Sequence, residues 1–129
     1  MRILIVEDEI DLQTALESLI KASFPQSEIE AVSNIDETIS WMKSQQLNPN
    51  FGFDLILADV SLQGEYTGFD LWKICSEMYP NTHFVFMSGI STQEFMEKLK
   101  DDPKCPPFLS KPFTAKQVKE LLKRVMDSR

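Results

Sequence analysis

The sequence predicts an α/β fold in which helices cover both faces of a doubly wound, five-stranded parallel sheet. Short runs rich in Val, Ile and Leu alternate along the chain with longer segments whose apolar residues recur at helical spacing. Residues 3–6 and 55–58 are apolar throughout, which is typical of strands buried on both faces. With 129 residues, the chain is expected to form a single domain over residues 1–129.

The first two βα units are expected before residue 45. Residues 2–6 predict a buried strand, and the helix that follows should end at Pro25, because proline cannot continue a helix. Residues 28–32 are more polar, which suits an edge strand, and Ser33 or Asn34 can cap the second helix. The apolar faces of the two helices are expected to comprise Leu12, Ala15, Leu16, Leu19 and Ile20, and then Ile35, Ile39 and Met42.

Three more units follow a loop at residues 45–52, which contains Asn, Pro and Gly. The predicted strands are residues 53–58, 83–87 and 106–110. A helix with Leu71, Cys75 and Met78 on one side follows the third strand, and capping boxes at residues 91–94 and 114–117 predict the starts of the last two helices. The expected strand order is 2-1-3-4-5, the flavodoxin-like order of a (βα)5 fold.

Polar residues stand directly after four of these strands, at the edge where such a fold binds its ligands. They are Glu7, Asp8 and Glu9 after the first strand, Asp59 after the third, Ser88 after the fourth and Lys111 after the fifth. Clustered carboxylates repel one another, and a divalent cation relieves this repulsion. Hard oxygen ligands with open positions suit Mg²⁺, which keeps several waters and shares its shell with a phosphate.

Together with Mg²⁺, this set of residues suits phosphoryl transfer. Asp59 can act as a carboxylate nucleophile and form an acyl phosphate. Lys111 would bind one phosphoryl oxygen as a point charge, and Ser88 could donate a hydrogen bond to another.

Each feature taken alone has an ordinary structural explanation. A lone Asp59 would more often be a turn or cap residue, Ser88 a turn residue and Lys111 a surface residue. The acids at residues 7–9 could simply charge the first turn of a helix, where the macrodipole favours acid. Chance should not place all four features at successive strand ends, so the combination favours phosphoryl transfer.

Composition narrows the function classes further. The net charge of −7 argues against direct nucleic-acid binding, which normally needs a basic surface. Cys75 and Cys105 are thirty positions apart and His83 is the one histidine, so neither a zinc site nor a disulfide framework is indicated. Apolar runs are too short for a membrane span, and no signal peptide opens the sequence, so a cytoplasmic location is expected.

At these positions the sequence resembles the receiver domains of two-component response regulators over nearly its whole length. The matching segments are residues 3–9, 54–62, 86–89 and 108–113. The resemblance implies that Glu7 and Asp8 bind Mg²⁺, with Asp8 the direct ligand, and that the backbone carbonyl of Ser61 completes the protein ligands. It makes Asp59 the phosphoacceptor, Ser88 the switch hydroxyl and Lys111 the phosphate-binding lysine. It also implies a cis peptide bond between Lys111 and Pro112.

The sequence departs from the common pattern of the family in two places. Gln63 stands where proline is frequent, and the loop over residues 63–68 is one residue longer than the commonest form. Ser61 and Ile90 occupy the two positions that help to set the rate of phosphoryl hydrolysis in this family. An apolar Ile90 cannot orient a water molecule, so slow self-dephosphorylation is predicted.

We expect a stand-alone or isolated signalling domain rather than an ordinary enzyme. It could act through protein partners, relay the phosphoryl group to a second histidine domain, or be a fragment of a larger regulator or hybrid kinase. A histidine kinase or a histidine phosphotransfer protein would supply the phosphoryl group. Phe108 would turn inward when Ser88 moves, although its ordinary role is that of a core residue. The face formed by the fourth helix, fifth strand and fifth helix would then contact a downstream protein, and Phe95 or Met96 could lie on it.

Three alternative interpretations fit the sequence less well. A receiver that binds partners without phosphorylation is disfavoured, because the complete set of site residues is present. A flavodoxin-like cofactor binder would need a phosphate-binding loop where the three acids of residues 7–9 stand. An aspartyl-phosphate hydrolase would have a second aspartate in place of Ser61.

Overall fold

The computed structural model describes residues 1–45, 47–48, 52–61, 64–89, 97, 99 and 101–127. The capping box predicted at residues 91–94 lies outside this set, as do Ile90, Phe95 and Met96. The expectations that concern them therefore stay predictions.

The described chain forms a parallel sheet covered by helices on both faces. Its elements are β1 (Arg2–Val6), α1 (Ile10–Ser23), β2 (Glu28–Val32), α2 (Ile35–Ser44), β3 (Leu55–Asp59), α3 (Gly68–Met78), β4 (His83–Ser88), β5 (Phe108–Ser110) and α5 (Ala115–Asp127). The strand order is β2-β1-β3-β4-β5, and all four pairings are parallel. The predicted fold class and strand order are thereby confirmed. No helix in the described ranges is long and apolar enough to cross a membrane.

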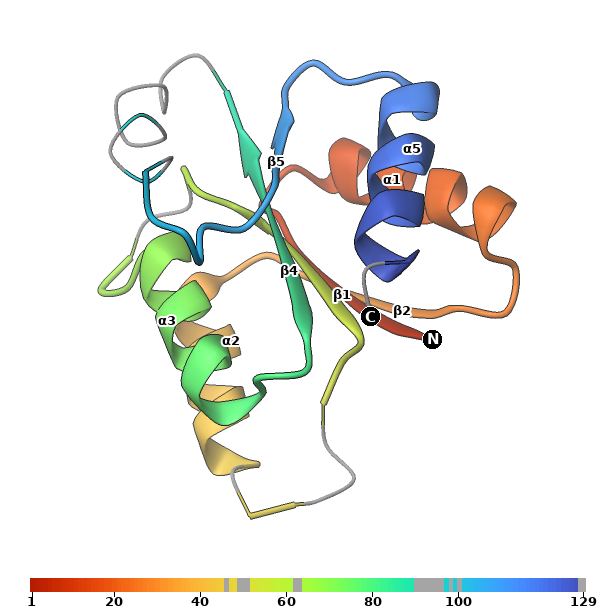
Figure 1. Ribbon diagram of the computed structural model, residues 1–129. Coiled ribbons are helices and arrows are strands. Elements are labelled where there is room, and N and C mark those ends of the chain that lie inside the picture. The colour runs from red at the N-terminus through yellow and green to blue at the C-terminus, as the bar shows by residue number, and fades with distance from the viewer. Residues whose placement is uncertain are drawn as a thin grey trace.

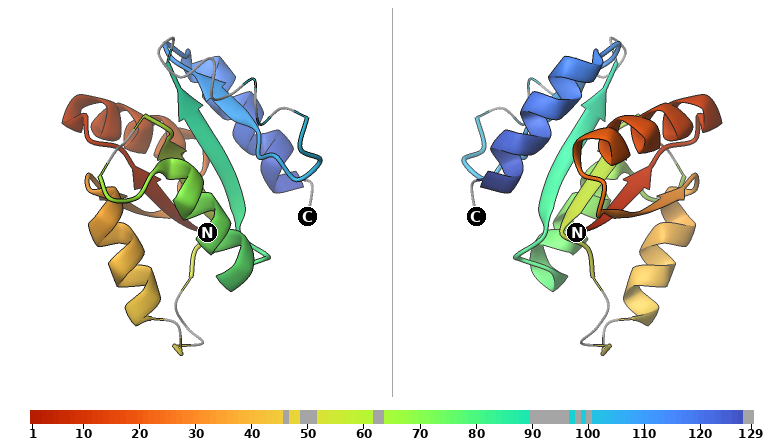
Figure 2. Two further views of the ribbon diagram at one scale, coloured as in Figure 1. Left: turned by 90° about the vertical axis from the view of Figure 1, so that its left-hand side faces the viewer. Right: turned by 90° about the vertical axis from the view of Figure 1, so that its right-hand side faces the viewer.

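The sheet separates two apolar layers. Helices α1 and α5 lie on one face, and α2 and α3 lie on the other (Figures 1 and 2). Successive residues of a strand point to opposite faces, so Leu4 and Val6 pack toward α2 and α3 while Ile3 and Ile5 pack toward α1 and α5. This two-sided burial explains why the central strands are apolar throughout. On α1, Ala15 is exposed rather than part of the predicted apolar face.

The bounds of β1 and β2 are as predicted, and those of the other strands differ from the predicted ones by one or two residues at an end. β3 begins at Leu55 rather than at residue 53, and it includes Asp59, which pairs with Met87 of β4. β5 loses two predicted residues at its start, because Pro106 and Pro107 have no N–H to donate to the ladder.

Side-chain caps fix the starts of three helices near the carboxyl edge of the sheet. Asn34 accepts a hydrogen bond from the backbone N–H of Glu37 at 3.0 Å and so caps α2. Thr114 and Gln117 form the predicted box at the start of α5, with hydrogen bonds of 2.8 and 3.2 Å. A box between Thr67 and Asp70, which was not predicted, starts α3.

Gly68, the first residue of α3, packs directly on the backbone of β3 and its end. A Cβ added there would lie 3.0 Å from the carbonyl oxygen of Asp59 and 3.1 Å from Cα of Val60. We expect Gly68→Ala to lower the free energy of unfolding by about 1–3 kcal/mol, because the buried strand backbone cannot easily yield. Urea denaturation measures this change.

Gly89→Ala is the matched control, since a Cβ there meets nothing within 4 Å. Equal stability of the native protein and the Gly68→Ala variant would contradict the close-packing explanation.

Candidate functional site

The site lies at the carboxyl edge of the sheet, where the ends of four strands meet. Glu7 and Asp8 directly follow β1, Asp59 ends β3, Ser88 ends β4, and Lys111 directly follows β5. The strands are parallel and adjacent in the order β1-β3-β4-β5 (Figure 1). The residues at their ends therefore approach one another, although up to 104 positions separate them in sequence.

Lys111 joins two buried carboxylates at the centre of the site. Its Nζ lies 2.6 Å from Oε1 of Glu7 and 2.6 Å from Oδ2 of Asp59. Glu7 is fully buried and Asp59 is 2% exposed, whereas the Lys111 side chain keeps 23% of its exposure. Isolated buried carboxylates are costly, and the ammonium group of Lys111 offsets part of this cost for both acids.

The electrostatics of the two carboxylates differ. Burial, together with the neighbouring Asp59, raises the pKa of Glu7 from 4.5 to about 7 despite the hydrogen bond from Lys111. Burial also acts to raise the pKa of Asp59, but hydrogen bonds from Lys111, Glu7 and Ser61 outweigh it and lower this pKa. Asp59 is therefore the ionised carboxylate near neutral pH, and Glu7 is the group that can hold a proton.

The second oxygen of Asp59 is also bonded. The backbone N–H of Ser61 donates to Oδ1 at 2.8 Å, and the Ser61 hydroxyl donates to the same oxygen at 2.7 Å. The Asp59 carboxylate is thus held at both oxygens, by Lys111 on one and by Ser61 on the other. Its orientation is fixed before any ligand arrives.

The three acids have the arrangement that a cation site needs. Glu7, Asp8 and Asp59 each offer a carboxylate oxygen, and these oxygens lie within 4.8 Å of one another. Asp8 is exposed, whereas the other two are buried, so the cluster opens to solvent on the Asp8 side. Hard oxygen ligands with an open side fit Mg²⁺, and the residues present therefore agree with the predicted ion.

Ser88 holds the backbone of Lys111 in place. Ser88 is 3% exposed, pairs with Ser110 in the register of β4 and β5, and accepts a hydrogen bond from the Lys111 N–H at 2.6 Å. The peptide bond between Lys111 and Pro112 is cis, as predicted.

Phe108 lies partly buried against the core on the α3 side of the sheet. Its ring stacks on Phe86, with centroids 5.8 Å apart and an interplanar angle of 15°, and Trp72 meets Phe86 edge-on at 6.0 Å. The structure thus places Phe108 in the core role that the sequence allowed. Its role in switching stays a prediction.

Two side chains that support the site were missed by the sequence analysis. The Gln13 amide group donates to the carbonyl oxygens of Glu7 and Val32, and so ties the ends of β1 and β2 together. The Asp36 carboxylate accepts two backbone hydrogen bonds from the segment after Asp59. Neither residue belongs to a sequence motif, because each contact depends on the tertiary fold.

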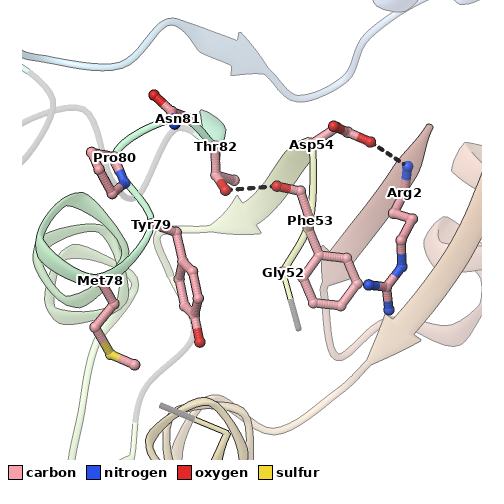
Figure 3. Close-up of a pocket in the computed structure, with 9 residues that line it drawn as sticks. All are labelled: Arg2, Gly52, Phe53, Asp54, Met78, Tyr79, Pro80, Asn81 and Thr82. Carbon is pink, nitrogen blue, oxygen red and sulfur yellow. Dashed lines mark hydrogen bonds between the residues drawn. The ribbon is translucent and has the colours of Figure 1, made fainter. Parts of the chain in front are cut away.

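A cleft of about 390 Å³ lies near the opposite end of the sheet (Figure 3). It is lined by Arg2, Phe53, Asp54, Tyr79 and Thr82, among others. Within it, the Asp54 carboxylate accepts a hydrogen bond from the Arg2 N–H at 2.8 Å, and the Thr82 hydroxyl donates to the Phe53 carbonyl at 2.6 Å. These hydrogen bonds join strand starts, so the cleft is separate from the acidic site.

Comparison with known proteins agrees with this geometry. Residues 3–123 match the response regulator receiver domain family. The sensory transduction protein LytT of Bacillus subtilis (strain 168) is 30% identical over 124 residues, which cover 96% of this chain and 47% of LytT. The chain therefore spans about half the length of this relative.

Solved structures support the same fold. A response regulator receiver protein from Sinorhizobium medicae WSM419 superposes with a TM-score of 0.79 at 23% identity, over 99% of this chain and 95% of that chain. An uncharacterized protein from Neptuniibacter caesariensis reaches 0.81 at 19% identity, over 98% of this chain and 87% of that chain. With its acidic edge, its sheet order and the family match over residues 3–123, the chain belongs to the response regulator receiver domains.

Proposed function

We propose that this chain is an active phosphoacceptor, which receives a phosphoryl group on Asp59 from a phosphohistidine. The donor would be a histidine kinase or a histidine phosphotransfer protein. The observation that carries the proposal is the contact of Lys111 with the buried carboxylates of Asp59 and Glu7, at 2.6 Å each. A cation beside an ionised, oriented carboxylate supports a nucleophilic role for Asp59.

In the transfer step, an oxygen of Asp59 attacks phosphorus and forms a P–O bond. The P–N bond to the donor imidazole breaks, and the imidazole leaves with the electron pair. Lys111 would exchange its contact with Asp59 Oδ2 for one with a phosphoryl oxygen. Ser88 would donate a hydrogen bond to a second phosphoryl oxygen, and its place at the end of β4 supports that role.

Glu7, Asp8 and Asp59 would hold Mg²⁺, together with the backbone carbonyl of Ser61. The bound ion supplies positive charge that offsets the charge on the phosphoryl oxygens. The burial of Glu7 and Asp59 supports this assignment, because buried acids in contact repel each other when both are ionised.

The phosphorylated chain would act as a signalling domain rather than as a turnover enzyme. Ser88 and Phe108 would shift between two packings, and the surface of β5 and α5 would contact a downstream protein in the cytoplasm. LytT is described as a sensory transduction protein, and this relationship supports a signalling role. We also propose slow self-dephosphorylation, because the apolar Ile90 cannot orient a water molecule. Ile90 lies outside the described residues.

Incubation with Mg²⁺ and acetyl phosphate is expected to add one phosphoryl mass to the native protein. Asp59→Asn should abolish this gain, because the amide is not a carboxylate nucleophile, and EDTA should abolish it in the native protein. Intact-protein mass spectrometry measures both effects. A native protein that gains no mass would instead favour a partner-binding domain that works without phosphorylation.

The Mg²⁺-free protein is expected to lose stability between pH 5 and pH 8. Glu7 binds its proton more tightly when folded, with a pKa of about 7 against 4.5, so its contribution is fully present below pH 4.5 and is lost as the pH rises through 7. The loss should be at most about 3 kcal/mol. Asp59, with a lowered pKa, and Lys111, with a raised one, do not titrate in this window.

Glu7→Gln is the matched variant, because glutamine imitates the protonated acid at every pH. Urea denaturation in EDTA at pH 5 and pH 8 should give a smaller pH effect for this variant than for the native protein. Equal pH effects in both proteins would show that Glu7 does not hold the proton.

A further inference from the structure

A side-chain link joins α2 to the loop that follows Asp59. Asp36, the second residue of α2, accepts a hydrogen bond from the backbone N–H of Glu65 on Oδ2 at 2.9 Å. Its Oδ1 accepts one from the N–H of Tyr66, also at 2.9 Å. A carboxylate is suited to this task, because its two oxygens can accept from two successive backbone donors.

The contact between Asp36 and the loop is close. A Cβ added to Gly64 would lie 2.5 Å from Oδ2 of Asp36, so the carboxylate packs directly against the loop backbone. A second link comes from the other end of α2, where Nζ of Lys43 lies 5.2 Å from the centroid of the Tyr66 ring. Helix α2 thus holds the loop at two places.

Both ends of the same loop are fixed at the candidate site. At its start, the Val60 N–H donates to the Met87 carbonyl at 3.0 Å. At its end, Gly68 packs on the carbonyl of Asp59, and the capping box of Thr67 fixes the entry to α3. The Asp36 hydrogen bonds are therefore the fixed point in the middle of the loop.

Ser61 is close to this fixed point along the chain. It stands three peptide links before Gly64, which is at most about 11 Å of chain. The N–H and hydroxyl of Ser61 both donate to Oδ1 of Asp59, so a displacement of Ser61 would change the hydrogen bonds of this carboxylate.

We propose that Asp36 is a positioning residue for the phosphoacceptor site. Through its hydrogen bonds to Glu65 and Tyr66, it holds the loop so that Ser61 stays beside Asp59 and the cation site is formed in advance. The inference rests on the proposed function and adds to it a residue that touches neither phosphoryl group nor metal. Because a site that is formed only part of the time binds its ligand more weakly, loss of the link should weaken Mg²⁺ binding by about fivefold.

Calorimetric titration with Mg²⁺ tests the proposal on three variants. Asp36→Asn replaces one acceptor oxygen by an NH₂ group that opposes a backbone N–H. Gly64→Ala keeps the charge of Asp36 but pushes its carboxylate off the loop. Glu37→Gln removes the same charge from the neighbouring residue, whose exposed side chain makes no hydrogen bond to residues 64–67 in the described part of the chain.

Asp36→Asn and Gly64→Ala are both expected to weaken Mg²⁺ binding about fivefold, whereas Glu37→Gln should change it less than about twofold. In phosphorylation by acetyl phosphate, Asp36→Asn and Gly64→Ala should need more Mg²⁺ for a half-maximal rate. Both should reach the rate of the native protein at saturating Mg²⁺. This split separates positioning from a general loss of stability, which thermal melting measures in parallel.

If the native protein binds Mg²⁺ and is phosphorylated, two results would overturn the role of Asp36 without affecting the proposed function. One is an equal change in Asp36→Asn and Glu37→Gln with none in Gly64→Ala, which indicates charge alone. The other is a lower melting temperature in both loop variants with native Mg²⁺ affinity, which indicates a structural role only. A native protein that neither binds Mg²⁺ nor gains a phosphoryl group overturns the proposed function as well.

Discussion

The contact of one ammonium group with two buried carboxylates is the interaction on which the arrangement of this site depends. Glu7 and Asp59 come from adjacent central strands, so the sheet itself forces them together. Lys111 reaches them from β5, two strands away from β3, and its backbone is held by the Ser88 carbonyl. One ammonium cannot balance two ionised carboxylates, so either a proton on Glu7 or a cation must supply the remaining charge.

In the resting site, both carboxylate oxygens of Asp59 already have hydrogen-bond partners. Asp59 has Lys111 on one oxygen and Ser61 on the other, so a new group on Asp59 must displace existing partners. Under the proposed function, a phosphoryl group on Asp59 would therefore displace Lys111 or Ser61 from this carboxylate. A ligand shifts a conformational equilibrium only when its contacts differ between the two states, and the proposed exchange of Lys111 from Asp59 to a phosphoryl oxygen would supply such a difference.

Much of the fold and of the site could be predicted from the sequence, because buried strands leave local apolar runs. The alternation of strands and helices then limits the possible strand orders. Continuous apolar runs predicted the central strands, and parallel strands place the residues after them at one edge. The sequence alone did not predict that Glu7 is buried while Asp8 is exposed. That difference depends on the continued ladder, in which the Glu7 N–H donates to the Val32 carbonyl. The Asp36 hydrogen bonds join residues 29 and 30 positions apart and have no local pattern at all.

Strand β5 and helix α2 are connected to Asp59 in different ways, and this difference has a mechanical consequence. Toward β5, the connection runs through a charged side chain and one backbone hydrogen bond, from Asp59 to Lys111 and on to Ser88. Toward α2, it runs through the loop backbone to Asp36. A side chain can exchange partners without moving the strand that carries it, whereas the Asp36 contacts are made to the backbone of Glu65 and Tyr66. Under the proposed function, a rearrangement at Asp59 would therefore be easiest on the Lys111 side, where one side-chain contact has to change partners.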